Sequence, residues 1–106
     1  MAVTVMALFR PKSGHEAELM ACMRDHLPVL RARGLATDAP STVLRAADGT
    51  LVEIFDWRSP EAIYAAHADP EVAKLWARYA ACCEYVTLAD LAESRAMFPS
   101  FERVTL

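Results

Sequence analysis

The chain has 106 residues, of which 55% are hydrophobic and 24% charged, and its formal net charge is −3. These values exclude an intrinsically disordered chain, which would be poorer in apolar residues and more highly charged. They also exclude a basic nucleic-acid-binding surface, because the 11 lysines and arginines are scattered and outnumbered by 14 acidic residues. Its apolar runs fall well short of the roughly 18 residues that a membrane helix needs. The composition therefore predicts a single domain over residues 1–106 with a hydrophobic core.

The cysteines Cys22, Cys82 and Cys83 favour a reducing compartment. An odd number of cysteines, two of them adjacent, makes a poor disulfide framework, and no Cys/His spacing typical of a zinc site occurs. The segment Met1–Phe9 carries no charged side chain, so it does not have the pattern of a signal peptide. We therefore expect a cytoplasmic protein with no metal site.

The predicted elements begin with a strand over Val3–Phe9, which Pro11 ends. The segment Ser13–Glu16 has the pattern of a capping box, in which Ser and Glu each satisfy a free backbone N–H. A helix should follow to about Arg33, with Gly34 just beyond its end. Its apolar residues recur at helical spacing and form one stripe. The members of this stripe are Leu19, Met20, Met23, Leu27 and Leu30.

Two further strands, Ser41–Ala46 and Thr50–Trp57, flank Asp48-Gly49, a dipeptide typical of tight hairpin turns. A two-residue turn would place Leu44 opposite Glu53. Alternation of side chains then predicts the two faces of the hairpin. One face carries Leu44, Leu51, Glu53, Phe55 and Trp57, and the other carries Val43, Val52 and Ile54.

The second half of the chain contains two helix starts of the same kind, Ser59-Pro60 and Asp69-Pro70, each a cap residue followed by proline. They predict a helix that breaks and restarts. A short helix is expected over Leu88–Arg95 and a last strand over Phe98–Leu106. The helix that starts at Asp69-Pro70 has an apolar stripe of Val72, Leu75, Trp76, Tyr79 and Cys83.

This order of elements, β-α-β-β-α-β, predicts a ferredoxin-like α+β fold. In that fold a four-stranded antiparallel sheet carries both helices on one face. The first and third strands are apolar on both faces, whereas a strand with one wet face should alternate. Something must therefore cover the sheet face away from the helices. A second copy related by a two-fold axis is the simplest cover, so we expect a homodimer.

Several segments together resemble the antibiotic-biosynthesis monooxygenase-like family over nearly the whole chain. They are Phe55–Ala62 (FDWRSPEA), Ala66-His67, Asp69–Val72 (DPEV), the opening Pro11–Glu16 and the tail Met97–Glu102. The resemblance implies a dimeric α+β barrel. Many members of this family are cofactor-free oxygenases of polycyclic aromatic or quinol substrates, and some degrade haem. The haem-degrading branch uses an asparagine, and because this chain has none, that branch is not expected.

His67 is the first candidate for a catalytic base, since it occupies the position of the family's Ala-His pair. It lies beside the break at Asp69-Pro70, near the start of the next helix, where the helix dipole disfavours a charged imidazolium. A neutral ring can accept a proton. The alternative interpretation is that the ring caps free backbone groups at the break.

Glu53 is the second candidate for the base, because alternation places it on the face of Phe55 and Trp57. A covered carboxylate among aromatic rings needs a partner or becomes neutral, and such an environment suits a general base. The alternative interpretations are an ion pair with an arginine of the partner subunit and an edge position open to water.

Six side chains are candidates for the walls of a hydrophobic substrate pocket between the sheet and the helices. Trp and Tyr carry polar atoms that need a partner when buried, which favours a wet pocket over a dry core. The alternative is that the helical stripe simply fills the core. The six are Met23, Phe55, Trp57, Tyr64, Trp76 and Tyr79.

The remaining reactive side chains give weaker signals. Cys83 continues an apolar stripe and is expected to be a small buried residue. His15 and His26 are expected at the surface or at the edge of the first helix stripe. No metal-ligand spacing and no glycine-rich phosphate loop occurs.

We therefore expect a cofactor-free, monooxygenase-like enzyme that acts on a small aromatic or polycyclic substrate. The base would remove a proton from an electron-rich aromatic molecule, and the resulting carbanion would react directly with O₂. The alternative is a non-catalytic small-molecule-binding protein of the same dimeric fold. A third possibility is a structural dimer whose interior is filled by its own side chains.

Overall fold

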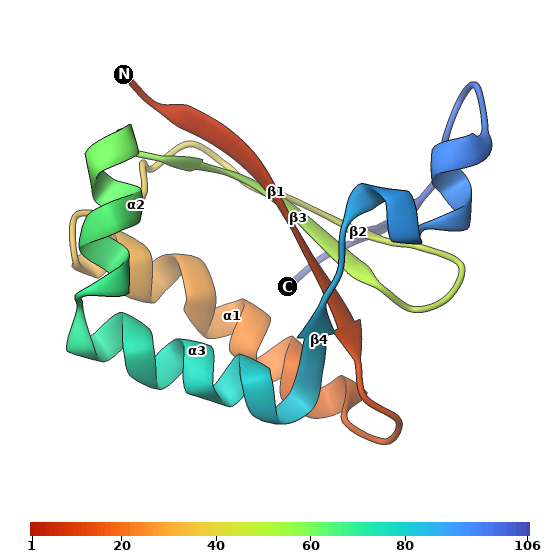
Figure 1. Ribbon diagram of the computed structural model, residues 1–106, viewed down its shortest axis with the longest axis horizontal. Coiled ribbons are helices and arrows are strands. Elements are labelled where there is room, and N and C mark those ends of the chain that lie inside the picture. Colours follow the sequence, from red (N-terminus) through yellow and green to blue (C-terminus); the bar gives the residue numbers. More distant parts are fainter.

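The computed structural model describes residues 1–106 as two layers, a five-stranded antiparallel sheet and three α-helices packed on one of its faces (Figure 1). The helices are α1 (Glu16–Ala32), α2 (Pro60–His67) and α3 (Pro70–Cys82). The strands are β1 (Val3–Pro11), β2 (Thr42–Arg45), β3 (Leu51–Trp57), β4 (Cys83–Tyr85) and β5 (Glu102–Val104), and their order in the sheet is β4-β1-β3-β2-β5. The α+β class is confirmed, and the arrangement is consistent with a ferredoxin-like fold.

The number of strands differs from the prediction of four. Cys83 does not continue the α3 stripe but begins β4, which pairs with the end of β1. The last strand covers only Glu102–Val104 instead of Phe98–Leu106. The helix expected over Leu88–Arg95 is instead two short 3₁₀ turns, η1 (Leu88–Asp90) and η2 (Ala92–Arg95). Short segments like these carry too few residues for periodicity to distinguish helix from strand.

The predicted register of the hairpin is wrong by one residue. Val43, not Leu44, lies opposite Glu53. The reason is a three-residue loop, in which Gly49 N–H donates to the Ala46 carbonyl and Gly49 has φ +92°. This is the geometry of a turn followed by a left-handed glycine rather than of a two-residue turn. A slip of one residue exchanges the two faces of a strand, so Val43 faces the helices and Leu44 faces away.

The helix starts were predicted with mixed success. Ser59 Oγ accepts from Ala62 N–H at 3.1 Å, and Asp69 Oδ1 accepts from Glu71 N–H at 2.9 Å, so both proline-associated caps are confirmed. The capping box of Ser13 is not formed, because α1 starts two residues later, after His15, with no side-chain cap.

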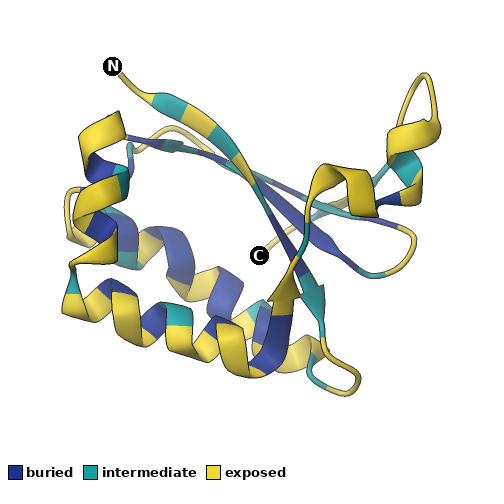
Figure 2. Ribbon diagram, in the orientation of Figure 1, coloured by how far each residue is buried: buried dark blue, intermediate teal, exposed yellow.

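The core consists of three clusters of buried side chains, two between the sheet and the helices and one on the opposite face. Figure 2 marks the buried residues along the ribbon in dark blue. The first cluster is Phe9, Leu19, Cys22, Met23, Val43, Leu51, Leu75, Tyr79, Cys82 and Cys83. The second cluster is Leu27, Leu30, Leu35, Ala36, Phe55, Trp57, Ala62, Ala66 and Val72. The third cluster is Leu8, Ala46, Val52 and Leu91.

The sheet face away from the helices is covered in part by the chain's own C-terminal segment. Leu91 is buried there, and Val86 and Phe101 pack beside it. This cover leaves Ile54 half-buried and Met6 exposed. The prediction that a second copy covers the whole of this face therefore applies, at most, to the part around these two residues. None of the helices combines the length and the apolar character that crossing a bilayer requires.

Candidate functional site

A histidine and a glutamate meet in the core between α1 and β3. His26 Nδ1 lies 2.5 Å from Glu53 Oε1, and both residues are buried, with exposed fractions of 4% and 0%. An ionised carboxylate can only accept, so in that state Nδ1 carries the proton and donates. The pair therefore fixes which ring nitrogen is protonated and leaves Nε2 with a free lone pair when the ring is neutral.

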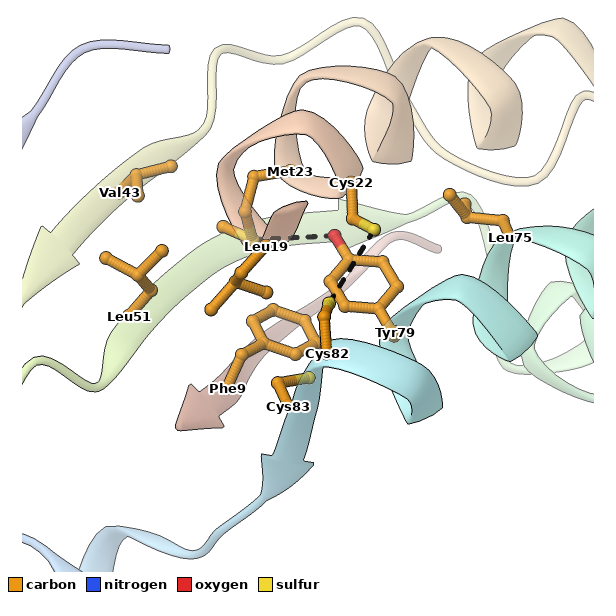
Figure 3. Close-up of a cluster of buried hydrophobic side chains, with 10 residues drawn as sticks. All are labelled: Phe9, Leu19, Cys22, Met23, Val43, Leu51, Leu75, Tyr79, Cys82 and Cys83. Carbon is orange, nitrogen blue, oxygen red and sulfur yellow. Dashed lines mark hydrogen bonds between the residues drawn. The ribbon is translucent and has the colours of Figure 1, made fainter. Parts of the chain in front are cut away.

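The surroundings of the pair are aromatic. The His26 ring packs edge-on against the rings of Phe55, Tyr79 and Phe9, with centroids 5.3, 5.4 and 6.2 Å away. Rings of this kind offer no strong acceptor or donor except the Tyr79 hydroxyl, which donates to Met23 Sδ at 3.4 Å (Figure 3). The pair thus sits in a low-dielectric environment, where hydrogen bonds and charges act more strongly than in water.

Two polar atoms of the pair remain without a partner in the chain. Glu53 Oε2 is buried and unpaired, and the only other buried unpaired side-chain atom is His15 Nδ1. His26 Nε2 makes no hydrogen bond within the chain either, and 5% of the His26 side chain is exposed. An unpaired buried polar group costs free energy, so it calls for an explanation in the protein's function.

The same buried environment changes the pKa of Tyr79, which lies next to the pair. Burial raises the pKa of Tyr79 well above its ordinary value, and the negative charge of Glu53 raises it further. Tyr79 therefore stays protonated and acts as a donor rather than as a base.

His67 lies apart from this pair. It is exposed on the last turn of α2, where its Nδ1–H donates to the Ile63 carbonyl at 2.8 Å, and its ring contacts Trp76 edge-on at 5.0 Å. These contacts are local, and none reaches Glu53. Its role as a base stays a prediction that no contact with a second titratable group supports.

The predicted wall residues separate into three groups. Phe55 and Trp57 are buried with their rings 5.4 Å apart, while Met23 and Tyr79 are fully buried in the first cluster. Trp76 is half-buried and borders both helix-side clusters, and Tyr64 points outward with 79% of its surface exposed. None of the four hollows in the molecular surface is lined by any of these six residues.

Sequence reasoning missed His26 as a member of the site. The expectation that it lies at the surface or at the helix edge is wrong. A signal was present, because His26 lies three and four residues after Met23 and Cys22 and four before Leu30, all of which are buried on α1. A histidine inside an apolar stripe, opposite a strand with an inward glutamate, predicts such a pair.

No family model, curated protein or solved structure matches the chain. The residues present also form no group of three or more His, Cys, Asp or Glu side chains that could hold a metal ion. The His26–Glu53 pair is therefore the feature of this structure that most directly indicates a chemical role.

Proposed function

We propose that the chain is a cofactor-free, monooxygenase-like enzyme that acts on a small aromatic or polycyclic substrate. In this proposal His26 is the base and Glu53 orients it. The supporting observation is the buried hydrogen bond between His26 Nδ1 and Glu53 Oε1, with the His26 ring packed against aromatic rings. A carboxylate that holds Nδ1–H stabilises the positive charge that develops when Nε2 accepts a proton.

The substrate would enter at the border of the second cluster. Five half-buried apolar side chains on β1, α2 and α3 border that cluster, and Phe55 of this cluster contacts the His26 ring. A flat apolar molecule gains free energy by covering such side chains. The five are Val3, Val5, Ala7, Ile63 and Trp76.

The proposed reaction needs only O₂ as co-reactant. His26 removes a proton from an acidic C–H group of the substrate, and the resulting carbanion is oxidised by O₂ to a hydroperoxide. Loss of water from the hydroperoxide leaves a carbonyl group, so one oxygen atom ends in the product and the other in water. Glu53 Oε2, which has no partner in the chain, would accept a hydrogen bond from this water or from a substrate hydroxyl.

We propose in addition that the working form is a cytoplasmic homodimer of the α+β barrel type. Three unbridged thiols support a reducing compartment. The exposed Met6 and half-buried Ile54 on the outer sheet face support a second copy as their cover.

Oxygen uptake with a hydroxylated anthrone, which has an acidic C–H group between aromatic rings, tests the proposal. The chain should accelerate uptake over buffer, and His26→Gln should lower the rate at least about a hundredfold, as expected for loss of a base. Glu53→Gln should lower it as well. His67→Ala tests the other candidate base, and it should retain the wild-type rate if His26 is the base.

Two outcomes would contradict the proposed enzymatic activity. One is a wild-type rate equal to that in buffer, and the other is an unchanged rate in a folded His26→Gln variant. If the anthrone quenches tryptophan fluorescence saturably without turnover, the non-catalytic binding protein is the better interpretation.

A further inference from the structure

Two cysteines far apart in the sequence face each other between α1 and α3. Cys22 Sγ and Cys82 Sγ are 3.9 Å apart, and both residues are buried in the first cluster (Figure 3). Cys83 is also buried but begins β4, and all three thiols are unbridged. Cys82 and Cys83 are neighbours in the sequence, but it is Cys22 and Cys82 that come together from two different helices.

The surface gives access to one member of this pair. A hollow of about 220 Å³ opens beside Cys22, and its other lining residues are Glu18, Ala21, Arg78 and Ala81. Cys82 and Cys83 do not line it. Of the two cysteines, only Cys22 lines the hollow, and its sulfur lies 3.9 Å from that of Cys82.

The helices need to move little for the two sulfurs to bond. A disulfide has an S–S distance of about 2.05 Å, so the sulfurs must approach each other by roughly 2 Å. Because α1 and α3 already pack against each other through this cluster, rotation of the two side chains and a small shift of the helices can supply that approach.

We propose that Cys22 and Cys82 form a modification site, a dithiol that small hydroperoxides convert to a disulfide. The Cys22 thiolate attacks the peroxide, so that an S–O bond forms and the O–O bond breaks with release of hydroxide or alkoxide. The Cys82 sulfur then displaces the hydroxyl group from Cys22, forming the S–S bond. The Cys82 proton ends in the water released, so two thiols are oxidised while one peroxide is reduced.

The disulfide would join the helix that carries His26 to the helix that carries Tyr79, whose ring packs against that of His26. Cys22 lies one helical turn before His26 on α1, and Cys82 lies one turn after Tyr79 on α3. Oxidation would therefore fix the spacing of the elements that hold His26 and Tyr79. The chemistry of the dithiol itself does not depend on the oxygenase proposal.

The rate of this oxidation should depend on pH. The pKa of Cys22 is raised to about 11, mainly by burial and by the neighbouring Cys82; Arg78 lowers it and Asp25 raises it by smaller amounts. Since the thiolate is the nucleophile, oxidation should be slow near neutrality and become roughly tenfold faster per pH unit in mildly alkaline solution.

Peptide mapping after treatment with hydrogen peroxide tests the proposal on the wild-type chain. Free thiols are alkylated in denaturant, and the expected product has lost the mass of two hydrogen atoms and contains a Cys22–Cys82 cross-linked peptide. The melting temperature should rise by about 10 °C, because a cross-link closing a long loop restricts the unfolded chain. Dithiothreitol should reverse both the mass change and the rise in melting temperature.

Cys83→Ala is the matched control, because Cys83 is an equally buried thiol next to Cys82. It should form the cross-link as the wild type does, whereas Cys82→Ala should not. A cross-link between Cys82 and Cys83, an intermolecular disulfide, or a folded chain left without a Cys22–Cys82 peptide would each overturn the proposal. Oxidation of Cys22 in the wild type to a sulfinic or sulfonic acid, instead of a disulfide, would also overturn the proposal.

Discussion

Glu53 is a fully buried carboxyl group with one oxygen bonded to His26 and the other unpaired. Moving such a group from water into a shell of aromatic rings is unfavourable unless its partner stays in place. Replacing both partners by apolar side chains is frequently neutral or stabilising, while removal of only one leaves a buried group without compensation. The pair therefore need not contribute to the stability of the fold, which is compatible with the functional role proposed for it.

A double-mutant cycle measures this coupling. His26→Leu should lower the free energy of unfolding by about 3–5 kcal/mol, because Glu53 then loses its only partner. Adding Glu53→Leu should recover much of this loss, so that the double variant is more stable than His26→Leu alone. Urea denaturation of the four proteins gives the values. Additive effects of the two substitutions would show that the pair is not coupled.

The sequence alone indicated one half of the His26–Glu53 contact and neither half of the Cys22–Cys82 contact. Alternation along the strand correctly placed Glu53 on the face of Phe55 and Trp57. Its partner His26 lies 27 residues earlier, and Cys22 lies 60 residues from Cys82. Such contacts depend on how α1 is rotated about its axis and on how closely α3 approaches, and neither follows from local periodicity.

At the scale of elements, short polar signals specify where α2 and α3 begin. Asp69 both caps α3 and pairs with Arg33, whose Nε lies 2.8 Å from Asp69 Oδ2. The hydrogen bond from Arg33 holds the pKa of Asp69 below its ordinary value, and backbone N–H donors act in the same direction. Ser59 caps α2 in the same way but carries no charge.

These two caps should differ in their dependence on pH. Asp69→Ala should lower the urea midpoint at neutral pH, because the folded state favours the carboxylate. Since the folded pKa is depressed, this contribution is present above about pH 4 and disappears as the pH falls through the lower folded value. Ser59→Ala, the control, should lose about 1 kcal/mol at every pH. An equal deficit for Asp69→Ala at low and neutral pH would contradict the explanation.

The starts of α2 and α3 were predictable because a cap residue followed by proline marks each of them. The register of the hairpin was not, because it depends on the type of turn. Asp48-Gly49 correctly indicated a hairpin, yet the third loop residue, Ala47, shifted the register. The dipeptide is compatible with both turn types, and packing of Val43 against the first cluster decides between them.

At the scale of the whole molecule, the two faces of the sheet are covered differently. The helices cover one face, whereas the C-terminal segment covers the other only around the third cluster. The same segment projects from the sheet (Figure 1). It carries two large exposed side chains, Met97 and Phe98, with exposed fractions of 88% and 83%. Apolar side chains exposed together in this way are typical of surfaces that bind a partner.

The proposed homodimer can be tested at the uncovered part of this face. Light scattering at tens of micromolar should give twice the chain mass of 11.7 kDa. Ile54→Asp should shift the protein to monomer, because a charge in the contact loses its hydration without gaining a partner. Tyr64→Asp is the control, since Tyr64 is exposed on α2, in the helical layer. It should leave the dimer intact. A wild-type chain that remains monomeric at this concentration would refute the dimer. If both variants are monomeric, the contact between the two copies lies elsewhere.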